Sequence, residues 1–225
     1  MTLRAAQYAD LAGRAVLIFI FAFVAAGKGV SLVTLLRGPE TPRVLDIIAH
    51  VTSIAFVALV VVMTLVRLKP VGNADGIEPR ISALAGTGLA LAIPLLPFAE
   101  NSAALQLTAL ILIMIGGALS TYVLLWLGRS FSIMAQARSL VTGGPYAIVR
   151  HPLYLTEEIV VIGVVINFLS IEAILIAALH WLIQLRRMTN EERVLRASFP
   201  EYEAYAKHTP KIIPRLFPKF SLGHA

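Results

Sequence analysis

Long apolar runs, separated by short polar segments, fill most of this chain. Four runs precede residue 128 and two follow residue 152; they cover 15–36, 45–66, 81–97, 103–127, 153–169 and 171–185. A helix needs roughly 20 predominantly apolar residues to cross a bilayer, so the pattern predicts an all-α integral membrane bundle. We expect about six transmembrane helices, or five if the last two runs form a re-entrant hairpin. The chain reads as one membrane domain, 1–225, with helices over 1–127 and a loop, a hairpin and a C-terminal helix over 128–225.

Glycine, proline and polar residues predict how these helices pack. Pro94 predicts a kink or tilt in the third helix, which is also short. Gly116 and Gly117 allow a neighbouring helix to approach the fourth closely. Only Asn167 and Ser170 mark a turn between the last two runs, which predicts a tight antiparallel hairpin.

The composition supports a membrane protein and excludes several kinds of site. Of the 225 residues, 58% are apolar and 14% charged, with a mean hydropathy of +0.81, whereas soluble domains are about half apolar and a quarter charged. The absence of cysteine excludes disulfides, thiolate metal sites and a cysteine nucleophile. No metal site is expected, and no obligate protein partner is evident from the sequence.

The net charge of +6 reflects membrane topology rather than nucleic-acid binding. Basic residues cluster at the ends of the apolar runs and in the tail, where they mark cytoplasmic segments and contact anionic membrane lipids. The tail after Gln184 carries Arg186, Arg187, Arg193, Arg196, Lys207, Lys211, Arg215 and Lys219. Counting back through six spans places the loop 128–152 on the same, cytoplasmic face.

The polar tail itself predicts short helices. Thr189 with Glu192, and Ser198 with Glu201, each fit the capping box that begins a helix. Apolar residues follow helical spacing through the same segment. We therefore expect one or two amphipathic helices at the cytoplasmic membrane surface.

One polar segment is dense in groups that can do chemistry. Residues 142–154 contain a Gly-Gly-Pro turn, two tyrosines and the adjacent pair Arg150 and His151, which a plain connector between membrane helices does not need. Because the last two helices are antiparallel and closely joined, the start of one must lie near the end of the other. That end carries Arg186, Arg187, Glu191 and Glu192. Topology therefore predicts a polar pocket on the cytoplasmic face with these two segments as its walls.

Several of these residues also have a purely structural interpretation. Arg186 and Arg187 point about 100° apart on a helix, so only one should face the pocket, and the spacing to the glutamates favours Arg187. His151 can cap the fifth helix, and Glu192 fits a capping box. Tyrosines near a membrane surface are also common as interfacial anchors.

The C-terminal third resembles a known family. The likeness is carried by Gly144-Pro145-Tyr146, Arg150-His151-Pro152 with Tyr154, an Arg ahead of Glu191-Glu192 with Leu195, then Phe199, Tyr202, Tyr205 and Pro214. This spacing is similar to the signature of the isoprenylcysteine carboxyl methyltransferase and phospholipid methyltransferase group, and it covers about 140–216. The resemblance implies an integral membrane enzyme that uses S-adenosyl-L-methionine, held by the loop, the hairpin ends and the C-terminal helix.

The chemistry of this donor matches the residue types of such a pocket. A carboxylate can hold ribose hydroxyls or the donor ammonium, an aromatic ring can face the sulfonium, and an arginine or histidine can bind the donor carboxylate. The candidate catalytic residues are therefore Arg150, Arg187 and Glu191. The candidate cofactor-binding residues are Leu140, Gly144, Tyr146, His151, Tyr154, Glu192 and Tyr205. One position departs from the family pattern, since relatives often carry a histidine where this chain has Arg138.

The acceptor is less constrained than the donor. We expect a lipophilic small molecule or lipid from the membrane, with carboxyl O-methylation of an isoprenylcysteine-like acceptor favoured over N-methylation of a phospholipid. A carboxylate acceptor needs no base, whereas an amine must lose a proton with the help of a Glu or His. Glu158 lies one helical turn from Tyr154 and is a candidate for the acceptor side. Lys28 and His180 are intramembrane polar groups to which the sequence assigns no role.

Two other function classes remain open. A sterol-reductase-like membrane enzyme has a similar C-terminal region and would use NADPH, although the short chain and the Glu-Glu pair argue against it. A transporter or assembly subunit would carry intramembrane charge pairs and repeated half-chains, whereas here the polar chemistry is concentrated at one face. A soluble doubly wound methyltransferase is excluded, since no glycine-rich turn follows a strand.

Overall fold

The computed structural model describes residues 3–39 and 41–214, and within them the chain is mostly helical. The long helices are α1 (Leu3–Arg37), α2 (Val44–Val66), α3 (Glu78–Ala92), α4 (Ala103–Leu127), α6 (Pro152–Asn167) and α7 (Ile171–Ser198). The shorter elements are the 3-10 turns η1 (Ile93–Leu95) and η2 (Gly128–Ser130), the helices α5 (Pro145–Ile148) and α8 (Tyr202–His208), and the strands β1 (Gly72–Asn73) and β2 (Gln136–Ala137). The predicted all-α bundle is confirmed.

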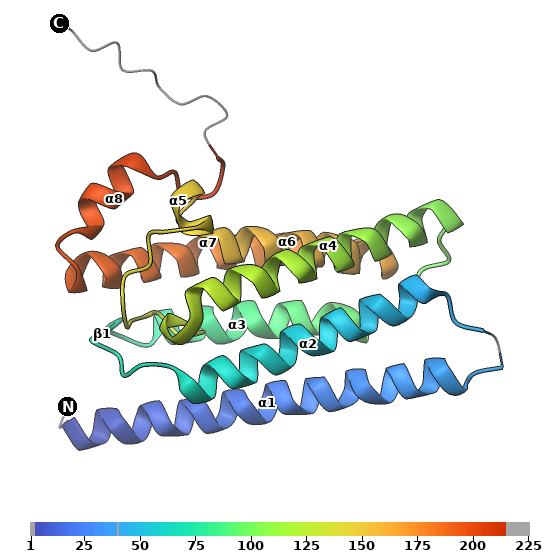
Figure 1. Cartoon of the computed structure of the whole chain (residues 1–225), viewed down its shortest axis with the longest axis horizontal. Helices are drawn as coiled ribbons and strands as arrows, with labels where there is room; N and C mark the ends of the chain where they lie inside the picture. The colour runs from blue at the N-terminus through green and yellow to red at the C-terminus, as the bar shows by residue number, and fades with distance from the viewer. Residues whose placement is uncertain (1–2, 40, 215–225) are drawn as a thin grey trace, which may run out of the picture.

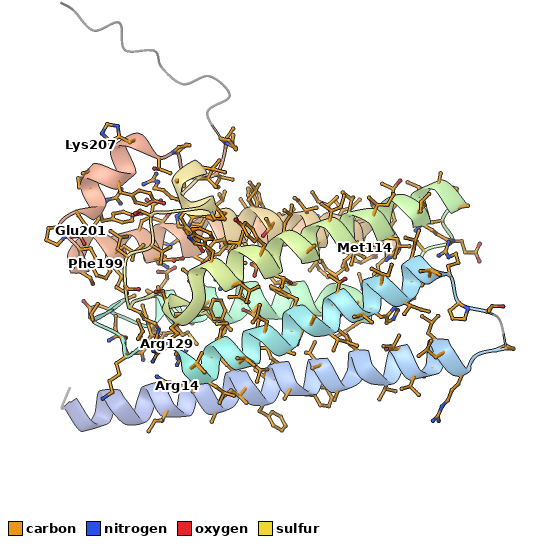
Figure 2. All side chains as sticks on the ribbon, in the orientation of Figure 1. Arg14, Met114, Arg129, Phe199, Glu201 and Lys207 are labelled. Atoms are coloured by element: carbon orange, nitrogen blue, oxygen red, sulfur yellow. The ribbon has the colours of Figure 1, made fainter. Side chains whose placement is uncertain are left out.

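The long helices run side by side and place the polar segments at one end of the bundle (Figure 1). α1 packs against α2, α2 against α4, α4 against α6, and α3 against α7. At the end that carries α5 and α8, β1 pairs antiparallel with β2, which ties the α2–α3 connection to the segment after α4. Figure 2 shows Arg14, Arg129 and Lys207 at this end, whereas Met114 lies part-way along α4. The loop and the tail thus meet at one end, as the topology predicted.

Three helices of the described chain are long and apolar enough to cross a membrane by length and composition: Gly13–Arg37, Val44–Val66 and Ala103–Ser130. The chain is a membrane protein. α3 and α6 have 15 and 16 residues, which is about 22–24 Å of helix and less than the roughly 30 Å hydrocarbon core. Pro94 lies in η1, where α3 tightens into a 3-10 turn, the distortion expected of this run. The count of about six spans stays a prediction for α3, α6 and α7.

The tail begins with a continuation of α7 rather than with a new helix. The Thr189 hydroxyl donates to the carbonyl of Leu185 one turn back (2.9 Å), so the first capping box lies inside a helix and the prediction of a helix start there is wrong. α7 stays helical at this point because it remains packed on α3. Asn190 is buried and donates to Glu78 of α3 (3.0 Å).

One short helix follows α7. α8 starts after Glu201, and no side chain caps its first turn, so the second capping box is not formed either. The helix ends at His208, and together with the extension of α7 it is the tail helix that the sequence predicted. Arg215 and Lys219, two of the predicted cytoplasmic charges, lie outside the described residues.

Two adjacent glycines let α4 approach helices on two sides. A methyl group at Gly116 would lie 2.8 Å from Cγ2 and 2.9 Å from the backbone nitrogen of Val160 in α6, and one at Gly117 would lie 3.2 Å from a side chain of α2. Close to this contact, the buried Ser120 hydroxyl donates to Thr156 of α6 (2.9 Å). The close packing predicted from the glycine pair is confirmed.

We expect Gly116→Ala to destabilise the protein, because the added methyl group would press on the backbone of Val160 and push α6 away from α4. Overpacking of this kind costs about 1–3 kcal/mol, which would lower the thermal unfolding midpoint in lipid nanodiscs. Gly88→Ala is the matched control, since its methyl group meets no atom within 4 Å and should leave the midpoint unchanged or raise it. Equal midpoints for the two variants would contradict the close approach of α4 and α6.

Candidate active site at the polar end of the bundle

A cavity of about 900 Å³ runs through the bundle. Its polar end lies beside α5 and α8 and is lined by Tyr146, Arg150, His151, Tyr154, Arg187, Glu191, Tyr202 and Tyr205. Its other end is mostly apolar and reaches Phe19 and Phe23 of α1 and Leu95 of η1, three side chains that are largely exposed on the outer surface. The cavity therefore connects the polar end of the bundle with its lipid-facing side.

A buried carboxylate organises the polar end. Oε1 of Glu192 in α7 lies 3.0 Å from Nε2 of His151 and 3.3 Å from Nη1 of Arg150. Arg196, one turn further along α7, lies 3.5 Å from the second oxygen. Burial alone would raise the pKa of this carboxyl, but the hydrogen bond with His151 and the nearby positive charges outweigh it, and the pKa is lowered. Glu192 is therefore an anion that fixes Arg150 and His151 at the start of α6.

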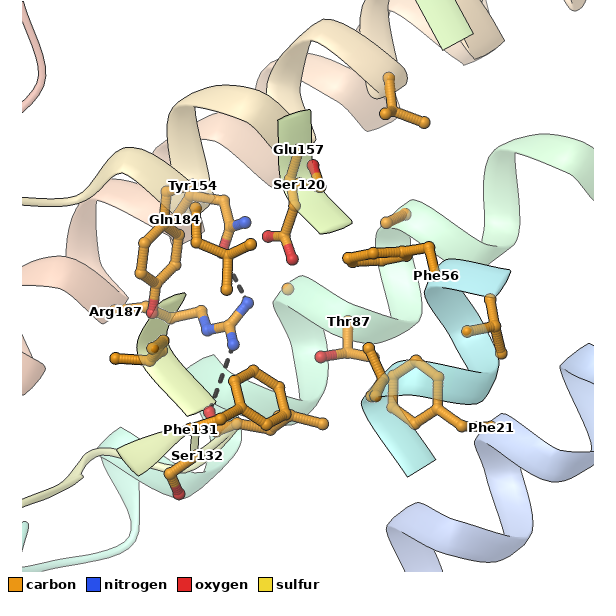
Figure 3. A pocket seen from close by; sticks show the side chains of 18 of the residues that line it. Phe21, Phe56, Thr87, Ser120, Phe131, Ser132, Tyr154, Glu157, Gln184 and Arg187 are labelled. Carbon is orange, nitrogen blue, oxygen red and sulfur yellow. Dashed lines mark hydrogen bonds between the residues drawn. The ribbon is translucent and has the colours of Figure 1, made fainter. Parts of the chain in front are cut away.

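The neighbouring glutamate holds a tyrosine instead. The Tyr154 hydroxyl donates to Glu191 (3.1 Å), and the Arg187 guanidinium lies 5.4 Å from the centroid of the Tyr154 ring, a cation–π distance. Figure 3 shows this guanidinium pointing into the cavity, held by hydrogen bonds to Gln184 (2.6 Å) and to the carbonyl of Ile133 (3.2 Å). Aromatic, basic and acidic groups thus converge within one helical turn of α7.

The segment after α8, residues 209–213, pairs with the start of α6 at this end of the bundle, and we call it the tail strap. The carbonyls of Pro210 and Lys211 accept backbone hydrogen bonds of 2.8 and 3.1 Å from the two residues that precede α6. Next to it, the Tyr205 hydroxyl of α8 donates to the carbonyl of Tyr146 (2.6 Å). Burial raises the pKa of Tyr205 to about 12, so its hydroxyl stays protonated and able to donate at neutral pH.

Gly144 forms the turn that leads into α5. Its φ is +57°, a conformation that residues with a side chain rarely adopt, and a methyl group there would overlap the Trp126 ring. We therefore expect Gly144→Ala to displace this turn at a cost of about 1–3 kcal/mol and to speed proteolytic cleavage within 128–152. Gly143→Ala is the control, because its methyl group would only touch Trp126 at 3.8 Å. Cleavage of Gly144→Ala at the wild-type rate would show that the turn tolerates a side chain.

Eight of the ten predicted site residues line the cavity: Leu140, Tyr146, Arg150, His151, Tyr154, Arg187, Glu191 and Tyr205. Glu192 lies behind this lining as the anchor of the α6 start, and Gly144 shapes the loop. Arg187 faces the cavity, whereas Arg186 pairs with Glu78 of α3 (2.9 Å), as the helical spacing predicted. The catalytic and cofactor-binding roles of these residues stay predictions.

Two positions near the family motifs have structural partners. Arg138, where relatives often carry a histidine, is buried, lines the cavity, and donates to the carbonyl of Leu68 and to Gln136 (2.6 Å). It therefore joins the α2–α3 connection to the loop and shapes the cavity wall. Lys28 of α1 lines the mostly apolar part of the cavity.

Among the polar residues that line the cavity, Glu157 and Gln184 lie beside Arg187 and were not assigned to the site from the sequence. Glu157 follows Tyr154 by three residues, a spacing that puts both on one helix face and could have revealed it. Glu158, the candidate for the acceptor side, instead lies 3.0 Å from Nε2 of His180 in α7 and is not part of the cavity lining. Gln184 gives no signal in the sequence, because only the packing of α7 turns it inward.

Comparison with known proteins identifies the segment that contains most of this site. Residues 109–197 match the model of the Isoprenylcysteine carboxyl methyltransferase (ICMT) family. This segment belongs to that family. It includes the loop, all of α6 and nearly all of α7, so the ICMT match covers both walls of the polar end. The resemblance drawn from the C-terminal motifs is confirmed.

Curated relatives align with about half of the chain. The Cobalt-zinc-cadmium resistance protein CzcN of Cupriavidus metallidurans is 36% identical over 105 residues, which is 46% of this chain and 48% of the relative. The Nickel-cobalt-cadmium resistance protein NccN of Alcaligenes xylosoxydans xylosoxydans is 34% identical over 104 residues, with the same coverage. The Protein-S-isoprenylcysteine O-methyltransferase of Schizosaccharomyces pombe is 36% identical over 118 residues, 48% of this chain and 49% of the relative. The chain thus spans about half the length of these relatives, two of which are named for metal resistance and one for methyl transfer.

Proposed function

We propose that this protein is an S-adenosyl-L-methionine-dependent methyltransferase that acts on a lipophilic acceptor from the membrane. The observation that carries the proposal is the cavity, which has charged and aromatic groups at one end and reaches the lipid-facing surface at the other. A polar donor from water and an apolar acceptor from the bilayer can meet in it. Because the basic tail surrounds the polar end, we place that end in the cytoplasm.

The polar end fits the donor group by group. Arg150 and His151 can bind the donor carboxylate, and the buried Nε of Arg150 has no hydrogen-bond partner in the described chain. Glu191 can accept from the donor ammonium or ribose, and the rings of Tyr154 and Tyr205 can face the sulfonium or the adenine. When bound, the donor supplies a methyl group on a positively charged sulfur. The protein contributes alignment and the exclusion of water, on which an in-line displacement chiefly depends.

Two kinds of reactive head group are compatible with an acceptor that has a lipophilic chain. The Schizosaccharomyces pombe relative is named for O-methylation of isoprenylcysteine, a name that suggests carboxyl O-methylation of an isoprenylcysteine-like acceptor. N-methylation of a phospholipid or another lipophilic amine is the alternative. A reductase using NADPH would need cations for several phosphate groups, whereas S-adenosyl-L-methionine presents a single carboxylate to Arg150 and His151, which favours the methyl donor.

Ligand binding to the purified protein in lipid nanodiscs tests this function. We expect saturable calorimetric binding of S-adenosyl-L-methionine, no binding of NADPH, and transfer of label from methyl-labelled donor to a membrane lipid extract. Binding of NADPH without binding of S-adenosyl-L-methionine would overturn the proposal in favour of a reductase. Binding of neither molecule would favour a non-enzymatic membrane protein.

A further inference from the structure

Cavity-lining residues follow one another along the inner face of α6 in a fixed order. From the polar end they are His151, Tyr154, Glu157, Val160 and Val164, a spacing of three or four residues that places them on one face. With a rise of about 1.5 Å per residue, Glu157 lies about 4–5 Å beyond Tyr154. It is the last charged residue on this face before the lining of α6 becomes apolar.

Glu157 directs its carboxylate into the same part of the cavity as the Arg187 guanidinium (Figure 3). Its electrostatic neighbours are Arg187 and His180 of α7 and the carboxylates of Glu158 and Glu191. No hydrogen bond or ion pair within the described chain engages the Glu157 carboxylate. Glu158, in contrast, is in contact with His180 (3.0 Å). Glu157 is therefore the carboxylate at this depth that is available to a ligand.

The negative charge of Glu157 favours an acceptor with an ammonium head group over one with a carboxylate head group. Arg187 donates to Gln184 and to the carbonyl of Ile133 and lies against the Tyr154 ring. Its single positive charge is outnumbered by the two carboxylates of Glu157 and Glu191, which interact electrostatically in the same region. A carboxylate head group placed here would lie beside the Glu157 carboxylate, and like charges repel strongly in a low-dielectric cavity. An ammonium head group would be attracted by the same carboxylate.

We propose that Glu157 selects an amine with a lipophilic tail as the methyl acceptor and takes the proton that this amine must lose. The inference rests on the proposed methyl transfer. It chooses the amine over the isoprenylcysteine-like carboxylate that the relative's name suggests, and it adds the base. The cavity opening at Phe19 and Phe23 admits the lipophilic chain of the acceptor from the bilayer, and the valines of α6 contact this chain beyond Glu157.

The proton and electron balance of this step is simple. An ammonium head group transfers one proton to the Glu157 carboxylate and becomes a neutral amine. The nitrogen lone pair then forms a bond to the methyl carbon as the carbon–sulfur bond breaks, and the electron pair of that bond stays on sulfur, which becomes a neutral thioether. The product nitrogen carries the positive charge, and Glu157 releases its proton to water through the polar end.

Matched amphiphiles test this inference. Purified protein in nanodiscs is incubated with methyl-labelled S-adenosyl-L-methionine and either dodecylamine or dodecanoate, which share one chain and differ in the head group. We expect label in the amine only. Glu157→Gln should lower kcat for the amine by about 10²–10⁴-fold with an unchanged Kd for the donor. The deficit should shrink as pH rises, because more of the free amine is then neutral without a base.

Glu158→Gln is the neighbouring control, since this carboxylate contacts His180 rather than the cavity and its variant should keep most of the amine activity. Label in dodecanoate alone, label in neither amphiphile with donor bound, or wild-type activity in Glu157→Gln would each overturn the inference and leave the donor proposal intact. Failure of the wild type to bind the donor would overturn the proposed function itself. If Glu157→Gln does not fold, the amine preference of the wild type still decides the acceptor class.

Discussion

Replacing Glu192 with alanine is expected to unfold the polar end of the bundle and to weaken donor binding. The residue is 5% exposed and contacts His151 (3.0 Å) and Arg150 (3.3 Å), so its removal leaves the Arg150 charge without its buried counter-ion. Removing one partner of a buried ion pair costs about 3–5 kcal/mol. We expect a loss of that size in the free energy of unfolding, measured by chemical denaturation. The donor Kd should rise at least about tenfold, which corresponds to about 1.4 kcal/mol.

Glu192→Gln separates the charge of this side chain from its shape. The amide keeps a polar atom beside His151 but cannot neutralise Arg150, so it should destabilise the protein less than alanine does. The pKa of Glu192 in the folded protein is lowered, so its contribution to stability is present above about pH 4.3 and lost as pH falls through the folded-state pKa. The wild type should therefore lose more stability on acidification than Glu192→Gln. Identical pH curves would contradict an ionic role for Glu192.

Arg187→Ala is expected to lower kcat by about 100-fold while most of the donor affinity remains. The guanidinium holds the Ile133 carbonyl and the Tyr154 ring and supplies positive charge opposite Glu157. Without it the loop at Ile133 and the Tyr154 ring of α6 lose their relative alignment, and a misplacement of about 1 Å can cost about 100-fold in rate. Transfer of label to the acceptor under saturating donor measures the effect. Arg187→Lys should recover little, because an ammonium lacks the planar set of donors.

Arg186→Ala is the matched control for this variant. Its side chain and that of its partner Glu78 are about half exposed, at 52% and 47%, and exposed ion pairs contribute only about 0–1 kcal/mol. We expect kcat close to that of the wild type. Equal losses in the two variants would point to a general disturbance of α7 and would remove Arg187 from the site.

The polar end of the site could be predicted because connectivity alone brings its walls together. Two short apolar runs joined by a tight turn must form an antiparallel hairpin, so the start of α6 and the end of α7 meet. This places Arg150 and His151 beside Glu191 and Glu192. The angle between successive residues on a helix also separates Arg187 from Arg186 before any packing is known.

The other features of the site and of α7 depend on tertiary packing, which no local sequence pattern reports. Glu157 and Glu158 are adjacent and both lie within a helical turn of Tyr154, so the spacing along α6 makes each of them a candidate. Only the contact of Glu158 with His180 of α7 shows which carboxylate already has a partner. The break expected at Thr189 is absent because contacts with α3 keep α7 helical. A capping box is a short-range preference, and here the packing contacts between α7 and α3 outweigh it.

The tail strap has a consequence for biosynthesis. It pairs through its backbone with the start of α6, a segment that leaves the ribosome long before residue 210, at a pace of about 5–20 residues per second. The membrane helices can therefore insert and pack before the start of α6 has gained these backbone partners. A polypeptide stalled before the strap would hold most of the lining residues without the two backbone hydrogen bonds that hold the start of α6. The polar end thus reaches its final arrangement only after residues 210 and 211 have been made, which separates insertion into the membrane from the completion of this end.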